Sequence, residues 1–198
     1  MAKISLELIQ QLRARTGVGL MDCRKALEEA NGDLEKAVEL LRKKGAAVAA
    51  KRAENTTGEG LVHAYIHPGA RLGVMVEINC ETDFVARTDD MKNFAQDICL
   101  QIAASKPIYL SPEDVDPAFL EREKDILRSQ LADSGKPDKI INQIVDGKVS
   151  KLYSEVCLMK QAFVKNDQLT IDDVLKDFIA KMGEKIVIKR FSRFEIGI

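Results

Sequence analysis

The sequence predicts an α+β protein in which a small three-helix module precedes a larger core. Apolar residues recur at helical spacing in three short segments within residues 1–45. Two alternating apolar segments follow at residues 61–66 and 72–78, and a third strand-like segment comes only at about 185–196. Because several helical segments separate the second strand from the third, we expect an antiparallel three-stranded sheet covered by helices on one face.

The three helices of residues 1–45 are indicated by their start and stop signals. Ser5 is expected to cap the first helix, and the glycines of Gly17–Gly19 interrupt it. Asn31-Gly32 closes the second, Asp33 caps the third, and Gly45 is expected to end it. Helices this short are marginal alone, so we expect them to pack together and to leave the loop between the first two exposed.

Residues 46–57 are expected to form a helical linker. The stretch Ala46–Ala53 is rich in alanine, and Asn55–Gly58 then breaks the helix. This reading divides the chain into a module at residues 1–45, a linker at 46–57 and an α+β core at 58–198.

The core is expected to begin with a β-hairpin whose loop, around Pro68–Arg71, is longer than two residues. A helix over about 88–104 follows. Ser111-Pro112 predicts the start of a helix that runs to Gly135, and Pro137 opens another that reaches about Glu155, so the two would form a helical hairpin. Thr170 precedes a last helix that ends at Met182-Gly183.

The composition indicates an ordinary globular protein. Hydrophobic residues make up 45% of the 198, and 30 basic and 31 acidic residues give a net charge of −1. Because basic and acidic residues balance so closely, we expect neither nucleic acid nor a membrane as a direct partner. The start of the chain lacks a signal-peptide pattern, no apolar run approaches the roughly 20 residues that span a bilayer, and the four cysteines form no Cys-x-x-Cys pair. We therefore expect a cytoplasmic protein.

Enzyme chemistry has weak support in the sequence. Neither phosphate-binding glycine motif is present, and His63 and His67 have only Glu77 and Asp83 as nearby oxygen ligands, so we predict no metal or cofactor site. A thiol enzyme stays open as an alternative, with Cys80 activated by His63 or His67 and oriented by Asp83. Against it, Cys80 continues the apolar side of its strand, which predicts burial.

The stretch Cys80–Arg87 joins the second strand to the next helix and places an acid beside an aromatic residue. In one interpretation Thr82-Asp83 is a helix N-cap and Phe84 is anchored in the core. In the other, these side chains are presented to a partner.

Two motifs decide between these readings. Thr16–Leu27, TGVGLMDCRKAL, resembles the N-terminal signature of the translation elongation factor Ts family, and Glu77–Ala86, EINCETDFVA, resembles its second signature. Ala104–Pro107, Ser134–Pro137 and Arg193–Glu195 are also similar to that family, so the resemblance runs nearly end to end.

The resemblance implies a guanine-nucleotide exchange factor that acts by binding and performs no covalent chemistry. Such a factor binds elongation factor Tu with GDP, displaces Mg²⁺, promotes GDP release, and holds the nucleotide-free partner until GTP binds. It also implies that the N-terminal module is akin to ubiquitin-associated domains and docks on the GTP-binding domain of elongation factor Tu.

Site residues follow from the same motifs. Those implied to disturb the partner's magnesium site are Thr82, Asp83, Phe84 and Val85. Those implied to grip the GTP-binding domain are Leu12, Thr16, Gly17, Val18, Gly19, Leu20, Met21 and Arg24. Phe163 and Val164 resemble a contact with a more distal domain of the partner.

Two further expectations concern surfaces. Val18, Leu20 and Met21 are expected to form an exposed apolar tip that a partner groove would cover. An adaptor that binds ubiquitin-like surfaces through the module is a second alternative. Because only one sheet is readable, the chain resembles the compact variety of the family, in which two copies pair sheet to sheet. We therefore expect a homodimer, without the C-terminal disulfide of some members because no cysteine follows Cys157.

Overall fold

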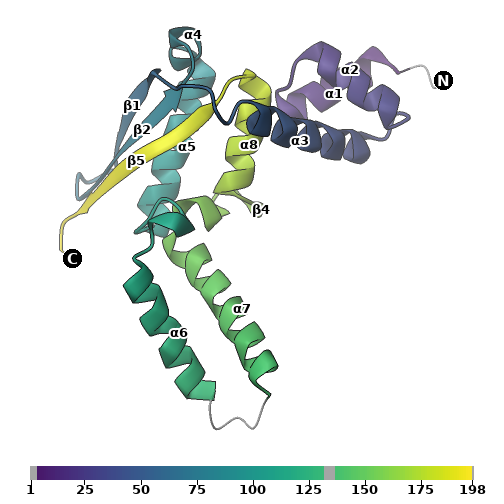
Figure 1. Cartoon of the computed structure of the whole chain (residues 1–198). Coiled ribbons are helices and arrows are strands. Elements are labelled where there is room, and N and C mark those ends of the chain that lie inside the picture. The colour runs from purple at the N-terminus through teal and green to yellow at the C-terminus, as the bar shows by residue number, and fades with distance from the viewer. Residues whose placement is uncertain (1–3, 132–136, 198) are drawn as a thin grey trace. The chain divides into compact units, whose positions relative to one another are not determined.

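The computed structural model describes residues 4–131 and 137–197 (Figure 1). The chain divides into two compact units. Unit 1 contains residues up to Tyr65 together with Met75–Cys99 and Asp173–Ser192, and unit 2 contains Ile66–Val74, Leu100–Asp172 and the residues from Arg193 onward.

Three helices open unit 1, as predicted: α1 (Leu6–Thr16), α2 (Leu20–Glu29) and α3 (Leu34–Lys51). The Ser5 hydroxyl accepts a hydrogen bond from the Leu8 amide at 3.2 Å, and the Asp33 carboxylate accepts from two amides in the first turn of α3. Both predicted N-caps are therefore confirmed.

The third helix is longer than predicted. It passes through Gly45 and ends at Lys51, so the expectation that Gly45 ends it is wrong. A single glycine inside a helix costs only about 1 kcal/mol relative to alanine, and the alanine-rich stretch that follows continues the helix. The expected linker is thus helical only as far as Lys51. The boundaries at residues 1–45, 46–57 and 58–198 stay a prediction.

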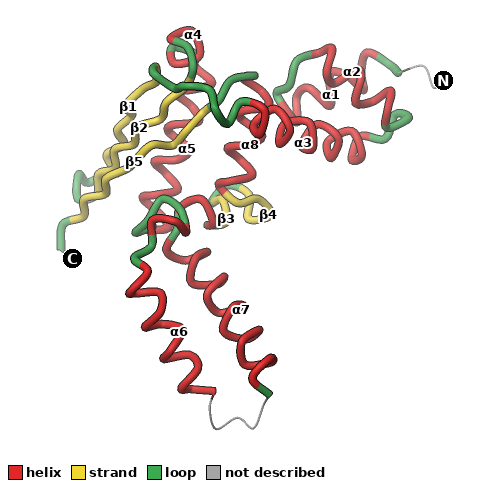
Figure 2. Tube along the Cα trace, viewed as in Figure 1, coloured by secondary structure: helices red, strands yellow, loops and turns green. Residues whose placement is uncertain are grey.

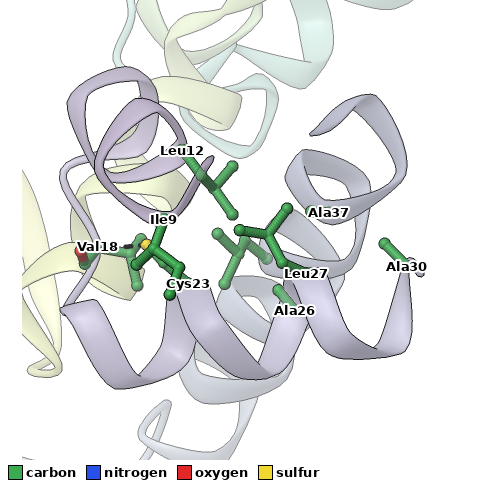
Figure 3. Packing of buried hydrophobic residues seen from close by; sticks show 9 residues of the cluster. Ile9, Leu12, Val18, Cys23, Ala26, Leu27, Ala30 and Ala37 are labelled. Atoms are coloured by element: carbon green, nitrogen blue, oxygen red, sulfur yellow. Dashed lines mark hydrogen bonds between the residues drawn. The ribbon is translucent and has the colours of Figure 1, made fainter. Parts of the chain in front are cut away.

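The three helices pack around a small apolar core (Figure 3). Side chains from all three, and from the loop between the first two, meet there: Ile9, Leu12, Val18, Cys23, Ala26, Leu27, Ala30, Ala37 and Leu41.

The predicted three-stranded sheet is confirmed. Its strands are β1 (Glu59–Ile66), β2 (Leu72–Cys80) and β5 (Ile186–Glu195), in the order β1-β2-β5 (Figure 2). The hairpin loop between β1 and β2 is longer than two residues, as expected, and is closed by the His67 amide donating to the Leu72 carbonyl at 2.9 Å.

Helices cover one face of the sheet. The first is α5 (Asp89–Ser105), and His63 of β1 bonds to its Gln96 at 2.8 Å. The second is α8 (Ile171–Met182), whose Phe178 stacks on Phe94 of α5 with ring centroids 4.3 Å apart. Val76, Ile78 and Cys80 of β2 are buried, as are Met91, Phe94 and Ile98 of α5.

Unit 2 contains the predicted helical hairpin of α6 (Pro117–Leu131) and α7 (Asp138–Val156), which lie side by side in Figures 1 and 2. The expected helix start at Ser111 is wrong. Ser111 caps a short 3₁₀ helix, η1 (Pro112–Asp114), by exchanging hydrogen bonds with Asp114, and α6 begins later. The predicted helix end at Gly135, with the rest of the motif at residues 134–136, lies outside the described residues.

Sequence reasoning missed a second, smaller sheet. After the 3₁₀ helix η3 (Leu158–Lys160), strands β3 (Ala162–Phe163) and β4 (Asn166–Thr170) pair antiparallel. Strands this short leave too few residues for a period-two pattern to be read.

Candidate partner-binding site

Phe84, one of the residues implied to disturb the partner's magnesium site, lies on the surface. Directly after β2 the chain forms a single helical turn, α4 (Asp83–Ala86), in which the Phe84 side chain is 82% exposed. The interpretation of Phe84 as a core anchor is therefore wrong. Val85 and Ala86 are buried instead, and since neighbouring residues on a helix point about 100° apart, burying these two turns Phe84 outward.

The polar residues of this turn already have partners within the chain. Thr82 is the N-cap of α4 and accepts from the Val85 amide at 3.5 Å, which confirms the predicted capping role. The Asp83 carboxylate pairs with Arg87 one turn later, at 3.0 Å. Both members of this ion pair are substantially exposed, so the pair adds little to stability and can be exchanged for other partners.

The residue before the turn is held firmly. Glu81 accepts two hydrogen bonds from Arg52 at 2.9 Å, one from the Asn55 side chain at 2.9 Å, and one from the Lys185 amide at 2.6 Å. The Lys185 amide, followed by these side-chain donors, lowers the pKa of Glu81. Hydrogen bonds from the end of α3 and the start of β5 thus converge at the base of the exposed turn.

The arrangement required by a thiol enzyme is not formed. Cys80 is fully buried, as its strand position predicted, and its thiol donates to the Thr82 carbonyl at 3.1 Å. Burial, and then the nearby Glu184 carboxylate, raise the pKa of Cys80, which disfavours the nucleophilic thiolate. His63 bonds to Gln96, and Asp83 pairs with Arg87, so neither is arranged to activate the thiol.

The four cysteines are free and buried, and no group of three or more His, Cys, Asp or Glu within the described ranges could hold a metal ion.

In the N-terminal module the predicted apolar tip is smaller than expected. Val18 is only 8% exposed, so its predicted exposure is wrong. Gly17 adopts a left-handed conformation, φ 68°, and Val18 then packs beside Ile9 and Cys23, whose thiol donates to the Val18 carbonyl at 3.4 Å (Figure 3).

The exposed members of the predicted docking set lie at the start of α2. Leu20 and Met21 are 43% and 60% exposed. Arg24 is exposed and pairs with Glu28. Leu12 is fully buried, which removes its side chain from the surface that a partner could touch. Thr16 bonds through its hydroxyl to the Leu12 carbonyl at 2.9 Å, so it helps to close α1.

Of the two residues predicted to contact a distal domain of the partner, one lies in the core and the other at the surface. Phe163 is buried, whereas Val164 is 48% exposed. The Val164 amide donates to the side-chain carbonyl of Gln101 at 2.8 Å, and the same glutamine donates to Gln161 and to the Ala162 carbonyl. Sequence reasoning missed this buried glutamine pair, because isolated glutamines on a helix and a loop give no signal that they meet.

These features define an α+β protein suited to protein–protein contact: an exposed aromatic residue on a clamped turn, and a second exposed apolar pair on a small helical module. No helix among the described residues is long and apolar enough to cross a membrane.

Comparison with known proteins gives the family. A family model described as "Elongation factor TS" matches residues 20–198. The relatives named elongation factor Ts from Thermoanaerobacter sp. (strain X514) and Caldanaerobacter subterraneus subsp. tengcongensis are each 55% identical over 194 residues, covering 98% of this chain and 95% and 97% of the relatives. The relative of that name from Desulfosudis oleivorans is 52% identical over 197 residues, with full coverage of both chains.

The chain belongs to the elongation factor Ts family. This membership confirms the predicted role as a nucleotide exchange factor of translation elongation, and it supports neither the thiol enzyme nor the adaptor for ubiquitin-like surfaces.

Proposed function

We propose that this chain binds elongation factor Tu in its GDP-bound form, displaces Mg²⁺, and holds the nucleotide-free partner until GTP binds. The observation that carries the proposal is the Phe84 side chain, 82% exposed on a turn whose neighbouring residues are buried. A complex that covers this ring would remove its apolar surface from water.

The exchange step then follows from linkage. A factor that binds the nucleotide-free partner more tightly than the nucleotide-bound one must weaken nucleotide binding by the same factor. Burying the Phe84 ring between separated elements of the partner contributes roughly 1.5–3 kcal/mol. Each 1.4 kcal/mol of coupling corresponds to about tenfold weaker nucleotide binding.

The other residues of the turn have supporting roles in this proposal. Asp83 leaves its ion pair with Arg87 and bonds instead to groups of the magnesium site of elongation factor Tu. There the Asp83 carboxylate also attracts the magnesium ion away from its ligands. Thr82 and Val85 act mainly by capping and packing, which keeps Phe84 outward. No covalent chemistry and no cofactor of this chain's own is involved.

The N-terminal module supplies the docking energy. Leu20, Met21 and Arg24 form its exposed contact surface, while Leu12 and Val18 support that surface from the core. Thr16, Gly17 and Gly19 shape the loop that leads into it, with Gly17 in the left-handed conformation. The domain boundaries at residues 1–45, 46–57 and 58–198 belong to this proposal, with the UBA-like module docking independently of the core. Val164, held by Gln101, provides a further contact with a distal domain, and Phe163 supports it from below.

A homodimer formed through the sheet is the second part of the proposal. In unit 2 the strand ends expose Ile66, Phe194 and Ile196, which line one groove together with Leu72. A second copy that pairs through this face would bury these side chains. We place the protein in the cytoplasm, with neither nucleic acid nor membrane as a direct partner.

Release of a fluorescent GDP analogue from elongation factor Tu tests the function directly. The chain at micromolar concentration should accelerate release manyfold, and excess Mg²⁺ should oppose the effect. A release rate that does not depend on the concentration of the chain would overturn the proposal.

A further inference from the structure

Both carboxylate oxygens of Glu184 bind one residue at the base of the exposed turn. The Thr82 hydroxyl donates to Oε1 at 2.7 Å, and the Thr82 amide donates to Oε2 at 3.1 Å. Glu184 lies between the end of α8 and the start of β5, so it reaches the turn from a segment more than a hundred residues away. Two hydrogen bonds to one carboxylate fix the direction of the Thr82 backbone as well as its position.

A turn as short as α4 requires such an anchor. A four-residue helix makes too few backbone hydrogen bonds to be stable alone. Its orientation is therefore set by what holds its first residue and by the side chains it buries. Rotating the turn by about 100°, the angle between consecutive residues of a helix, would bury Phe84 and expose one of its buried neighbours.

A second attachment lies next to the first. The Lys185 amide donates to Glu81 at 2.6 Å, and the Lys185 ammonium group donates to the Asn55 carbonyl at 2.8 Å. Thus Glu184 holds Thr82, and the next residue, Lys185, holds Glu81. This paired attachment, on two adjacent peptide units, restrains rotation about the strand axis, which a single hydrogen bond would allow.

We propose that Glu184 is a positioning residue for nucleotide exchange: by holding Thr82 it keeps α4 in the orientation that presents Phe84. The proposal rests on the proposed function of Phe84, and it predicts that removing the carboxylate impairs the exchange step more than docking. Docking is assigned to the N-terminal module, whose exposed residues lie on α2, whereas the Glu184 carboxylate accepts from Thr82.

The first measurement needs no partner. The chain contains no tryptophan, so Phe84→Trp places a single tryptophan, which can be excited apart from the three tyrosines, at the tip of the turn. In this background Glu184→Ala should lower the fluorescence anisotropy of residue 84, because the turn gains freedom. Glu184→Gln, which can still accept from the Thr82 amide, should restore most of the anisotropy. Thr82→Val, which removes both the hydroxyl donor to Glu184 and the acceptor that caps α4, should also lower the anisotropy.

The second measurement uses the chain with Phe84 in place and elongation factor Tu loaded with fluorescent GDP. Glu184→Ala should lower the maximal release rate about tenfold and leave the half-saturating concentration within about twofold. Glu121→Gln, which removes one exposed ion pair with Lys124 on α6, is the matched control and should change neither value.

Unchanged anisotropy at residue 84 in Glu184→Ala would overturn the proposal. So would a loss of release rate that Glu184→Gln does not relieve. A loss that appears only as weaker binding to elongation factor Tu would overturn it too. If Glu184→Ala fails to fold, Glu184→Gln and Thr82→Val carry both measurements. If the parent chain does not release GDP at all, the proposed function fails, and the anisotropy series still decides whether Glu184 holds the turn.

Discussion

Gly45 of α3 and Ala180 of α8 lie so close together that a Cβ atom on Gly45 would be 2.6 Å from the Cβ atom of Ala180. Such a distance does not occur between real Cβ atoms, so only glycine permits this approach of the two helices. Gly45 was expected to end a helix, but it lies buried within one. Its role is to let the two helices of unit 1 pack in direct contact.

Gly45→Ala should therefore lower the free energy of unfolding by about 1–3 kcal/mol, because the added methyl group forces the helices apart. Gly147 of α7 provides the matched control, since a Cβ there would meet nothing within 4 Å. Gly147→Ala should raise stability by about 0.4–1 kcal/mol, as an unstrained helical glycine does. Urea denaturation measures both, and equal effects of the two substitutions would contradict the close packing.

Phe84→Ala should reduce the maximal rate of stimulated GDP release by about tenfold to a hundredfold, the range that follows from 1.5–3 kcal/mol of lost burial. Its stability should change by less than about 0.5 kcal/mol, because the ring is exposed in the free chain. Ile108→Ala, at a residue that is 68% exposed in unit 2, serves as the control and should leave the rate unchanged. Equal rates of GDP release with the two variants would exclude the proposed role of Phe84 in exchange.

Residues of the N-terminal module, which we propose docks on the partner, should separate into two groups by burial. Met21→Ala, at a 60% exposed position, should weaken binding to elongation factor Tu about three- to thirtyfold, with little change in melting temperature. Leu12→Ala, at a fully buried position, should lower the stability of the module by about 2–5 kcal/mol. Calorimetric titration and thermal unfolding of both variants check this, and an unaffected affinity in Met21→Ala would remove α2 from the contact surface.

Alkaline pH should destabilise the chain partly through Cys99. Burial raises the pKa of this thiol to about 12 from an ordinary value of 9.0. Between these values the unfolded chain loses the proton and the folded chain keeps it, so stability falls as pH rises, with a slope of up to about 1.4 kcal/mol per pH unit from this group. Denaturation of Cys99→Ala between pH 9 and 11 should therefore show a flatter decline than the parent. Parallel declines would contradict the burial effect.

The proposed dimer would pair through the exposed end of the sheet, and sedimentation tests it. Sedimentation at micromolar concentration should give about twice the 22.0 kDa of one chain. Phe194→Glu should convert this species to a monomer, because a charge would be buried at the interface, and Phe194 is 71% exposed in the single chain. A parent that already sediments as a monomer would exclude pairing through this face at that concentration.

Most elements could be predicted because they depend on local signals. The caps at Ser5 and Asp33, the hairpin, and the helix that follows Thr170 all lie where local sequence placed them. The errors have separate local causes. The alanine-rich stretch after Gly45 continues α3, the cap between Ser111 and Asp114 closes a 3₁₀ helix before α6, and β3 and β4 are too short for a period-two pattern to be read.

For the site, sequence patterns indicated the candidate residues: the acid and aromatic at Asp83-Phe84 and the glycine-bounded loop before α2 stand in motifs long enough to indicate the family. Which of these side chains face outward depends on packing in the folded chain. Burial of Val85 and Ala86 turns Phe84 to the surface, while Val18 and Leu12 turn inward. The clamp of Thr82 by Glu184 joins residues 102 positions apart, and a contact at that separation exists only once the chain has folded.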